Sequence, residues 1–252
     1  MKLTNNTILI TGGGSGIGRG LAEAFYKLGN TVLIAGRRQS VLDETTAANP
    51  GLVGYTLDVE SLESIAAFTE KVTAEHPGLN VLINNSGIMR VENLLEQQPD
   101  LADATAIVTT NLLGPIRLTA ALLPHLLKQP DSAVINVSSG LAFLPLALTP
   151  TYCATKAALH SYTESLRYQL RKTGTQVIEL IPPYVATDLL GGASDPRAMP
   201  LGAFISEVIA ILTAEPGLTE INVENVKPLR FAAESGHYAG IFKGLNDSFA
   251  GE

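Results

Sequence analysis

The stretch TILITGGGSGIG, residues 7–18, decides the fold. A short apolar run, Thr7 to Ile10, leads into a glycine-rich turn, and an amphipathic segment from Gly16 to Leu28 follows and ends at Gly29-Asn30. In a turn between a strand and a helix, glycines let the backbone approach a pyrophosphate, and the amino terminus of the helix favours its charge. Tight turns also need glycine for steric reasons alone, but the strand–turn–helix context favours dinucleotide binding.

The same alternation continues along the chain. Apolar runs typical of strands follow at residues 31–35, 52–57, 81–83, 133–137 and 176–181. Helical patterns lie between them, at residues 40–48, 61–75, 99–127 and 152–170. Near-continuous apolar strands are typical of a parallel sheet that is covered on both faces. We therefore predict an α/β fold with one Rossmann-like, doubly wound parallel sheet in three layers (α/β/α), and residues 1–252 as a single dinucleotide-binding domain.

The pattern weakens beyond Pro200. Residues 201–213 predict a helix, residues 219–234 predict a second helix broken at Pro228, and no seventh strand can be placed. We expect an atypical, helical C-terminal third. Residues of about 188–215 would serve the substrate, and residues of about 216–252 would form a C-terminal extension within the same domain.

Composition narrows the class of protein. The chain has 252 residues, of which 46% are hydrophobic and 16% charged, and a net charge of −7 without a dense Lys/Arg run, which argues against a nucleic-acid partner or an anionic membrane surface. Cys153 is the only cysteine, so a reducing compartment is expected.

The first strand begins by Thr7, which leaves no room for a leader, and no apolar run reaches transmembrane length. The four histidines lack metal-ligand spacing. These features predict a soluble cytoplasmic protein without a metal site.

Tyr152 and Lys156 share one face of the predicted helix because they are four residues apart. A phenol with an ordinary pKa of about 10 is a poor base at neutral pH. A fixed ammonium beside it favours the phenolate and lowers that pKa. The pair could therefore exchange a proton with an alcohol or a carbonyl. Such spacing is common, and a surface lysine beside a tyrosine at the edge of the core is the alternative interpretation.

The end of the second strand indicates which dinucleotide binds. A carboxylate there would bind the ribose hydroxyls of NAD(H), whereas a basic residue accommodates the 2′-phosphate of NADP(H). The sequence has Gly36-Arg37-Arg38 and no acidic residue at this point. Because a charge-assisted hydrogen bond contributes about 1.5–3 kcal/mol, we favour NADP(H) over NAD(H). The alternative is that both arginines are solvated loop residues.

Polar residues also follow the third and fourth strands. Asp58-Val59 ends the third strand, where Asp58 could accept a hydrogen bond from an adenine amino group. Residues 84–87, NNSG, end the fourth strand, where asparagine side chains can tie backbone groups together and Gly87 lets the chain pass close to a ligand. Ordinary turns are the alternative at both places.

Asn111 lies inside the long predicted helix and is followed by Gly114-Pro115. Pro115 cannot donate a hydrogen bond to the carbonyl four residues back, which is that of Asn111. If the helix continues, this free acceptor could hold a water molecule that links Lys156 to solvent. A plain helix break at Gly-Pro is the alternative.

Taken together, these motifs resemble the short-chain dehydrogenase/reductase family. TGGGSGIG, Asp58-Val59, NNSG, Asn111, Ser139 and the Tyr152/Lys156 pair occur in the order and spacing of the family over roughly the first 190 residues. The phrases SGLAFLPLA, TYCATKAALHSYTESLRYQL and PPYVATD further resemble the branch of DltE-like oxidoreductases.

The resemblance implies a role for each matching residue. Tyr152 would be the acid/base at the substrate oxygen, and Lys156 would lower its pKa and bind the nicotinamide ribose. Ser139, thirteen positions before Tyr152, would hydrogen-bond the substrate oxygen, with Ser138 as the competing candidate. Asn111 would complete a proton relay. The predicted cofactor-binding residues are Thr11, Gly12, Gly14, Ser15, Gly16, Ile17, Gly18, Arg37, Arg38, Asp58, Val59, Asn85, Ser86, Gly87, Tyr152, Lys156, Pro182, Val185 and Thr187, the last matching a threonine that contacts the carboxamide.

The chain departs from the family pattern at three points. Ser86 replaces the usual alanine of NNAG, and Pro183 replaces the usual glycine of a Pro-Gly turn, which would change the local backbone geometry at the nicotinamide. The usual glycine-rich ending after a seventh strand is absent.

The predicted function is reversible hydride transfer between NADP(H) and a secondary alcohol or carbonyl compound. A mostly apolar pocket predicts an apolar or weakly polar small-molecule substrate. Its expected wall consists of Met89, Leu141, Phe143, Leu144, Tyr184, Val185, Leu189 and Leu190. The alternatives are a dinucleotide-responsive regulatory protein or a non-redox enzyme, such as a hydrolase, on the same fold. The complete Tyr/Lys/Ser/Asn set argues against a regulator.

The long helix suggests an oligomer. It carries more leucine and isoleucine side chains than one buried face needs, at positions 112, 113, 116, 118, 122, 123, 126 and 127. Family members commonly pair this helix and the Tyr152 helix across a two-fold axis, so a homodimer or homotetramer is predicted. Cys153 is expected to be a small packed thiol rather than a nucleophile.

Overall fold

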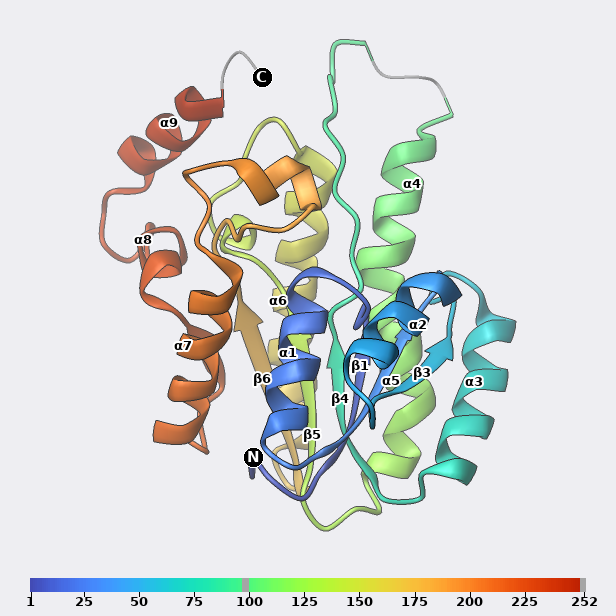
Figure 1. The fold of residues 1–252 in the computed structure, drawn as a ribbon. Coiled ribbons are helices and arrows are strands. Elements are labelled where there is room, and N and C mark those ends of the chain that lie inside the picture. Colours follow the sequence, from blue (N-terminus) through green and yellow to red (C-terminus); the bar gives the residue numbers. More distant parts are fainter. Residues whose placement is uncertain (97–99, 250–252) are drawn as a thin grey trace.

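The computed structural model describes residues 1–96 and 100–249 (Figure 1). The strands are β1 (Thr7–Thr11), β2 (Thr31–Gly36), β3 (Val53–Thr56), β4 (Leu79–Asn84), β5 (Ser132–Val137), β6 (Thr175–Ile181) and β7 (Glu220–Asn222). They form one parallel sheet of seven strands in the order β3-β2-β1-β4-β5-β6-β7. The helices are α1 (Gly16–Lys27), α2 (Gln39–Ala48), α3 (Leu62–Glu75), α4 (Ala102–Val108), α5 (Gly114–Leu126), α6 (Pro150–Leu170), α7 (Leu201–Ala214), α8 (Lys227–Arg230) and α9 (Tyr238–Phe249). The predicted Rossmann-like α/β class is confirmed.

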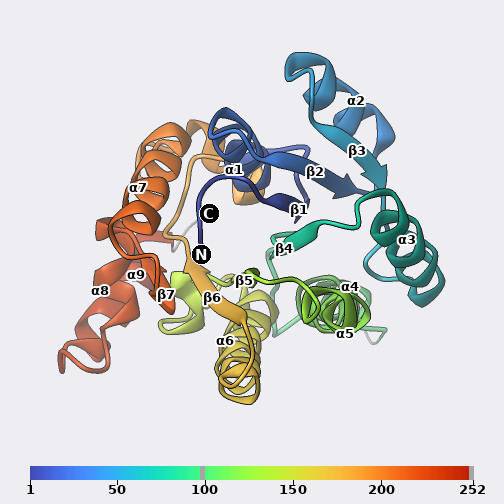
Figure 2. The same cartoon turned by 90° about the horizontal axis from the view of Figure 1, so that it is seen from below.

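Helices cover both faces of the sheet, as Figure 2 shows. Ile8 and Ile10 of β1 point to the face covered by α1 and α7, whereas Leu9 points to the face covered by α3, α5 and α6. All three side chains are fully buried. Burial on both faces explains why the strands appear in the sequence as continuous apolar runs rather than as alternating ones.

The strand order reverses beside β1. From β1 the chain builds outward to β2 and β3, and it then returns to build β4 on the other side of β1. In doubly wound sheets, ligands bind beyond the carboxyl ends of the strands at this reversal. The end of β1, at Thr11, is where the glycine-rich turn begins.

The long helical region differs from a single continuous α-helix. Pro99, its predicted start, lies outside the described residues, and α4 begins at Ala102. A π-helical turn, Thr109–Leu113, separates α4 from α5, and Asn111 is at its centre. Pro115 therefore falls in the first turn of α5, where a helix tolerates proline. Single π-helical turns are frequent at functional sites.

By length and composition alone, the stretch Ala102–Leu126 would be able to cross a membrane, contrary to the expectation that no apolar run is long enough. Its leucines Leu118, Leu122 and Leu126 are fully buried against the sheet. Arg117, on the same helix, donates a hydrogen bond to the backbone carbonyl of Glu60. The stretch is thus packed as a core helix of this fold.

The C-terminal prediction is wrong in its details. A seventh strand exists, because β7 pairs in parallel with β6, and the helix predicted over 219–234 is replaced by β7, a 3₁₀ turn at Glu224–Val226 and the short α8. The strand has only three residues and two of them are polar, Glu220 and Asn222, so it lacks the apolar run that identifies the other strands. Pro228 lies in the first turn of α8 instead of breaking a longer helix.

Candidate active site

The glycine-rich turn is shaped by close backbone contacts. Gly12 has φ +66°, a conformation that favours glycine. A Cβ atom at Gly18 would lie 2.3 Å from the carbonyl oxygen of Gly12 and 2.4 Å from Nδ2 of Asn85. The Asn85 side chain in turn donates a hydrogen bond of 2.9 Å to the carbonyl of Thr11. The predicted link between the end of β4 and the turn after β1 is therefore present.

The amino terminus of α1 opens into a cavity of about 430 Å³. Ser15 precedes the helix, and its side chain makes no capping hydrogen bond, while the first turn contains no acidic residue. Ser15, Gly16 and Ile17 all line the cavity. Free backbone N–H groups at a helix amino terminus favour an anion such as a phosphate.

Most of the predicted cofactor-binding residues line this cavity or a second one of about 350 Å³ on the β2 side of the turn. Those that do are Gly12, Gly14, Ser15, Gly16, Ile17, Arg37, Arg38, Val59, Asn85, Ser86, Gly87, Tyr152, Lys156, Pro182, Val185 and Thr187. Thr11, Gly18 and Asp58 are not among the lining residues. Thr11 Oγ1 accepts hydrogen bonds from the backbone of Asn85 and Ser86, and Asp58 accepts one from the backbone of Glu60, so these residues shape the turns around the cavities.

The two arginines after β2 differ in their surroundings. Arg37 lines the second cavity and forms an exposed ion pair with Glu60, with 2.9 Å between the charged atoms. Arg38 lines both cavities and is the residue before α2. Helix α2 begins at Gln39, one residue before the predicted start at residue 40. Both arginines therefore line the cavity on the β2 side of the glycine-rich turn.

Tyr152, Lys156 and Ser139 meet at the floor of the larger cavity. Tyr152 and Lys156 come from successive turns of α6, which begins at Pro150, two residues before the expected start. The Lys156 ammonium lies 5.5 Å from the centroid of the Tyr152 ring and donates a hydrogen bond of 2.8 Å to the backbone carbonyl of Val137. Ser139 follows β5, and its hydroxyl hydrogen-bonds the Tyr152 side chain. The structure thus brings together three of the four predicted catalytic side chains.

The expected lowering of the Tyr152 pKa is not found in the protein alone. Burial raises the pKa of Tyr152 above its ordinary value, and the hydrogen bond from Ser139 offsets this only in part. Burial also lowers the pKa of Lys156 to about 8, against the opposing charge of Glu179. Desolvation is the largest cause of both shifts, because each side chain is almost wholly removed from solvent.

The fourth predicted residue, Asn111, lies behind these three. Its side chain is fully buried, accepts a hydrogen bond from the backbone N–H of Ile88 and donates one to the Ile88 carbonyl, both 2.8 Å long. A Cβ atom at Gly87 would lie 3.4 Å from Asn111 Oδ1 and 3.8 Å from Lys156 Nζ. Asn111 therefore fixes the segment that passes over Lys156, and it does so through its side chain rather than through its backbone carbonyl.

The structure separates the two candidate serines. Ser138 donates a hydrogen bond of 2.5 Å to the buried carboxylate of Glu179, whereas Ser139 faces Tyr152. Sequence reasoning missed Glu179. The available signal was a charged residue inside the otherwise apolar run of β6, VIELI.

Apolar side chains line much of the larger cavity. Met89, Leu141, Tyr184, Val185, Leu189 and Leu190 line it as predicted. Phe143 and Leu144 do not: Leu144 is fully buried in the core, and the Phe143 ring packs against His160 with 4.6 Å between ring centroids. The sequence also gave no indication that the C-terminal segment supplies Leu229, Leu245 and Phe249 to this wall.

Comparison with known proteins identifies the family. A family model described as short chain dehydrogenase matches residues 6–198. The chain belongs to the short-chain dehydrogenase family. The uncharacterized oxidoreductase DltE of Bacillus subtilis (strain 168) is 40% identical over 249 residues, which are 98% of each chain. The predicted resemblance to this family and to its DltE-like branch is confirmed, and the chain is an oxidoreductase of the family.

Solved short-chain dehydrogenases share the fold. A short chain dehydrogenase from Burkholderia cenocepacia J2315, in complex with NADP, has a TM-score of 0.81 at 24% identity and covers 97% of this chain and 99% of its own. The 3-ketoacyl-(acyl-carrier-protein) reductase from Brucella melitensis, complexed with NADH, has a TM-score of 0.75 at 26% identity and covers 86% and 92%. These short-chain dehydrogenases thus include proteins that bind either nicotinamide dinucleotide.

Proposed function

We propose that this short-chain dehydrogenase catalyses reversible hydride transfer between NADP(H) and a secondary alcohol or ketone with apolar substituents. The observation that carries the proposal is that Ser139, Tyr152 and Lys156 line the same cavity as the uncapped amino terminus of α1. One continuous space thus joins a phosphate site to a proton-transfer site.

The residues around the cavity fit a nicotinamide dinucleotide. The pyrophosphate would bind at the amino terminus of α1, beside Ser15, Gly16 and Ile17. The backbone N–H groups are available there because the Ser15 side chain does not cap them. Lys156 would hold the nicotinamide ribose, and Thr187 would contact the carboxamide. The bound nicotinamide would supply the carbon that donates or accepts the hydride.

Arg37 and Arg38 support the choice of NADP(H). A 2′-phosphate would meet Arg38 at the junction of the two cavities, and it would share Arg37 with Glu60. Phosphate and guanidinium geometry match through paired hydrogen bonds, which are roughly twice as strong as neutral ones. NAD(H), which has ribose hydroxyls at this position, would find no carboxylate at the end of β2.

The proton-transfer residues act on one substrate oxygen. During carbonyl reduction Tyr152 donates its phenolic proton to that oxygen, and during alcohol oxidation it takes the hydroxyl proton back. Ser139 hydrogen-bonds the same oxygen and fixes it beside Tyr152. The Lys156 ammonium stabilises the phenolate form of Tyr152 electrostatically. Asn111 holds residues 87–88 in place above Lys156 and completes the relay toward solvent.

The wall of the substrate end sets the chemical class. It is formed by Met89, Leu141, Leu190, Leu245 and Phe249, which offer apolar surface and no charge. Burial of apolar surface contributes roughly 25 cal/mol per Å². Substrates with alkyl or aryl groups next to the carbonyl are therefore favoured over charged ones.

A carbonyl panel followed by absorbance in the nicotinamide band tests the function. NADPH consumption with apolar ketones, slower with NADH, is the expected result. Cofactor binding without any turnover across the panel would instead favour the regulatory alternative. Turnover of only highly charged carbonyl compounds would contradict the assigned substrate class.

The proposal also includes that the protein is an oligomer and is located in the cytoplasm. Leu118, Leu122 and Leu126 of α5 face the sheet, whereas Ile116 and Leu123 on the same helix are only partly buried. These partly buried side chains support pairing with a second copy as a homodimer or homotetramer. Light scattering at micromolar concentration is expected to give at least twice the mass of 26.6 kDa, and a monomer would contradict this.

A further inference from the structure

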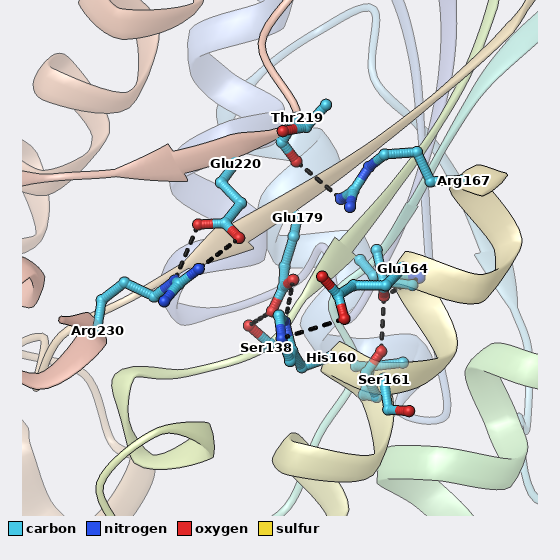
Figure 3. Close-up of polar contacts among 12 residues, drawn as sticks. Ser138, His160, Ser161, Glu164, Arg167, Glu179, Thr219, Glu220 and Arg230 are labelled. Carbon is cyan, nitrogen blue, oxygen red and sulfur yellow. Dashed lines mark hydrogen bonds and ion pairs between the residues drawn. The ribbon is translucent and has the colours of Figure 1, made fainter. Parts of the chain in front are cut away.

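A buried carboxylate lies directly beneath the proton-transfer site. Glu179, in β6, is fully buried. One carboxylate oxygen accepts the hydrogen bond from Ser138, and the other lies 2.7 Å from Nδ1 of His160 (Figure 3). Glu179 therefore joins the end of β5 to the outer part of α6 through its two oxygens.

Both partners of Glu179 are adjacent to proposed catalytic residues. Ser138 immediately precedes Ser139, which hydrogen-bonds Tyr152. His160 is one helical turn beyond Lys156 and two beyond Tyr152, so all three project from the same side of α6. A shift of the Glu179 carboxylate would thus move the segment that presents Ser139 and change the charge beside Lys156.

A buried carboxylate is costly unless it is hydrogen-bonded and its charge is balanced. The groups that can balance it are His160 and Lys156 on α6. The other charged groups near His160 are Glu164, 3.8 Å away on α6, and Glu220 on β7. An apolar residue at position 179 would avoid this cost, as its neighbours Ile178 and Leu180 do. The presence of a carboxylate at this buried position points to a local role.

The same side chains are close enough to hold a cation, because ligand atoms of His160, Glu179 and Glu220 all lie within 4.8 Å of one another. Each already has a protein partner, however. Arg230 binds both carboxylate oxygens of Glu220 at 2.9 Å, and His160 Nδ1 is bonded to Glu179. The geometry is that of a hydrogen-bonded charge network.

We propose that Glu179 is a positioning residue of the active site: its carboxylate fixes Ser138, and with it the backbone that presents Ser139, and its negative charge stabilises the ammonium form of Lys156. The inference rests on the proposed function and adds to it a residue that does not contact substrate.

The electrostatics agree with this role. Burial lowers the pKa of Lys156, and the charge of Glu179 is what opposes the lowering. The hydrogen bond to Glu179 is the largest cause of the raised pKa of His160, with smaller contributions from Glu164 and Glu220. Tyr152 is the other titratable group at Lys156. Removal of the Glu179 charge would therefore reduce the protonated fraction of Lys156 at a given pH.

Glu179→Gln tests the proposal, since it keeps the shape and removes the charge. Carbonyl reduction needs the ammonium beside the phenol, so it falls as pH rises through the pKa of Lys156. In the variant this alkaline loss of kcat is expected at a pH lower by about one unit, the low end of what a nearby opposite charge contributes. Glu164→Gln is the matched control, because it removes a charge near His160 from a side chain that is 61% exposed and does not touch Ser138. An unshifted alkaline limb in Glu179→Gln, or an equal shift in both variants, would overturn the proposal.

A second measurement needs neither cofactor nor turnover. The free energy of unfolding is expected to rise with pH once Lys156 loses its proton in the folded chain, and in Glu179→Gln this rise should begin at lower pH. If the wild-type protein reduces no carbonyl compound, the proposed function fails while this titration still tests the effect of Glu179 on Lys156. The same onset in both proteins would contradict the electrostatic role.

Ser138→Ala tests the positioning role separately. It removes the hydrogen bond to Glu179 but keeps the charge, so kcat is expected to fall about tenfold, as loss of a charged hydrogen bond would give, without a shift of the alkaline limb. If Glu179→Gln does not fold, Ser138→Ala decides the question, and an unchanged kcat in Ser138→Ala overturns the proposal. Glu179→Asp keeps the charge and should restore the alkaline limb to its wild-type pH.

Discussion

The ammonium of Lys156 lies 5.5 Å from the ring centroid of Tyr152 and is held there by the backbone carbonyl of Val137. The pair is thus pre-assembled in the protein alone, since the end of β5 fixes the lysine and the helix fixes the tyrosine. What the pair does depends on charges that the fold places around it.

Replacement of Tyr152 by Phe should abolish turnover without loss of the fold. The substitution removes only the phenolic oxygen of a side chain that is 5% exposed, so packing is retained. General acid–base catalysis contributes roughly 10²–10⁴-fold, and kcat is expected to fall by at least about 100-fold. NADPH fluorescence titration should give a dissociation constant close to that of the wild type. Near-wild-type activity would show that Tyr152 is not the acid/base.

Replacement of Arg37 by Asp should reverse the cofactor preference. The new carboxylate would repel a 2′-phosphate and could accept hydrogen bonds from ribose hydroxyls. The ratio of kcat/KM for NADPH to that for NADH is expected to fall at least about tenfold, the equivalent of one charge-assisted hydrogen bond. The ratio serves as its own control, because a general loss of activity would lower kcat/KM for NADPH and for NADH together. An unchanged ratio in Arg37→Asp and also in Arg38→Asp would refute the assignment of NADP(H).

Gly18→Ala should destabilise the glycine-rich turn. Its Cβ would lie 2.3 Å from the Gly12 carbonyl oxygen, so the backbone must shift. Overpacking of this kind costs typically about 1–3 kcal/mol, measured as a loss in the free energy of unfolding in urea. Gly202→Ala in α7 is the control, because its added Cβ has nothing within 4 Å and the helix gains from alanine. Equal stability of the two variants would mean that the tight contact at Gly18 is absent in solution.

Stability should rise between pH 8 and pH 10. The pKa of Lys156 is lowered to about 8 from an ordinary 10.5, so in this range the unfolded chain binds more protons than the folded chain, and the free energy of unfolding increases with pH. The increase is on the order of 2 kcal/mol, at about 1.4 kcal/mol per pKa unit. Above pH 10 the raised pKa of Tyr152 acts in the opposite direction, because the folded chain keeps a proton that the unfolded chain releases.

Lys156→Met is the variant that isolates this effect. It should be more stable than the wild type near neutral pH, because it removes a buried charge, and it should lack the rise above pH 8. Urea denaturation at a series of pH values measures both features. Persistence of the full rise in Lys156→Met would assign it to another group.

Truncation of the C-terminal wall should change substrate choice. Leu245→Ala and Phe249→Ala remove apolar surface from the cavity without touching Tyr152 or Lys156. We expect KM for apolar ketones to rise about tenfold and bulkier ketones to be better accepted, in line with about 1–3 kcal/mol for lost apolar contacts. Lys243→Ala on the same helix, with a side chain 77% exposed, should leave KM unchanged. If all three variants behave alike, α9 does not contact the substrate.

Much of the fold could be predicted because a doubly covered parallel sheet leaves a simple pattern. β1, β2 and β4 to β6 are buried on both faces and appear as apolar runs, and the motifs at their ends are local. β7 was not predicted from the sequence because Ile221 is its only apolar residue, between Glu220 and Asn222. A strand of three residues at a sheet edge depends on its partner β6 rather than on its own composition.

The parts of the site formed by residues close together in the sequence could be predicted. The parts formed by residues far apart in the sequence could not. Tyr152 and Lys156 are linked by helical spacing alone. The Ser138–Glu179 contact joins residues 41 positions apart, and the apolar run around Glu179 gives no sign of its partner. The orientation of Phe143, which packs on His160 and away from the cavity, is likewise set by tertiary contacts with α6.

The C-terminal segment packs on the loop that carries Ser139. A Cβ atom at Gly140 would lie 2.9 Å from Val226 and 3.2 Å from Leu229, while Arg230 binds Glu220 and covers the Phe143 ring at 4.3 Å. For protein engineering, this means that the last quarter of the chain cannot be replaced independently of the rest of the protein. A chimera that grafts the C-terminal segment of another dehydrogenase onto this scaffold would have to bring residues that fit against Gly140, Phe143 and Glu179, or it would displace the catalytic loop along with the specificity it was meant to change.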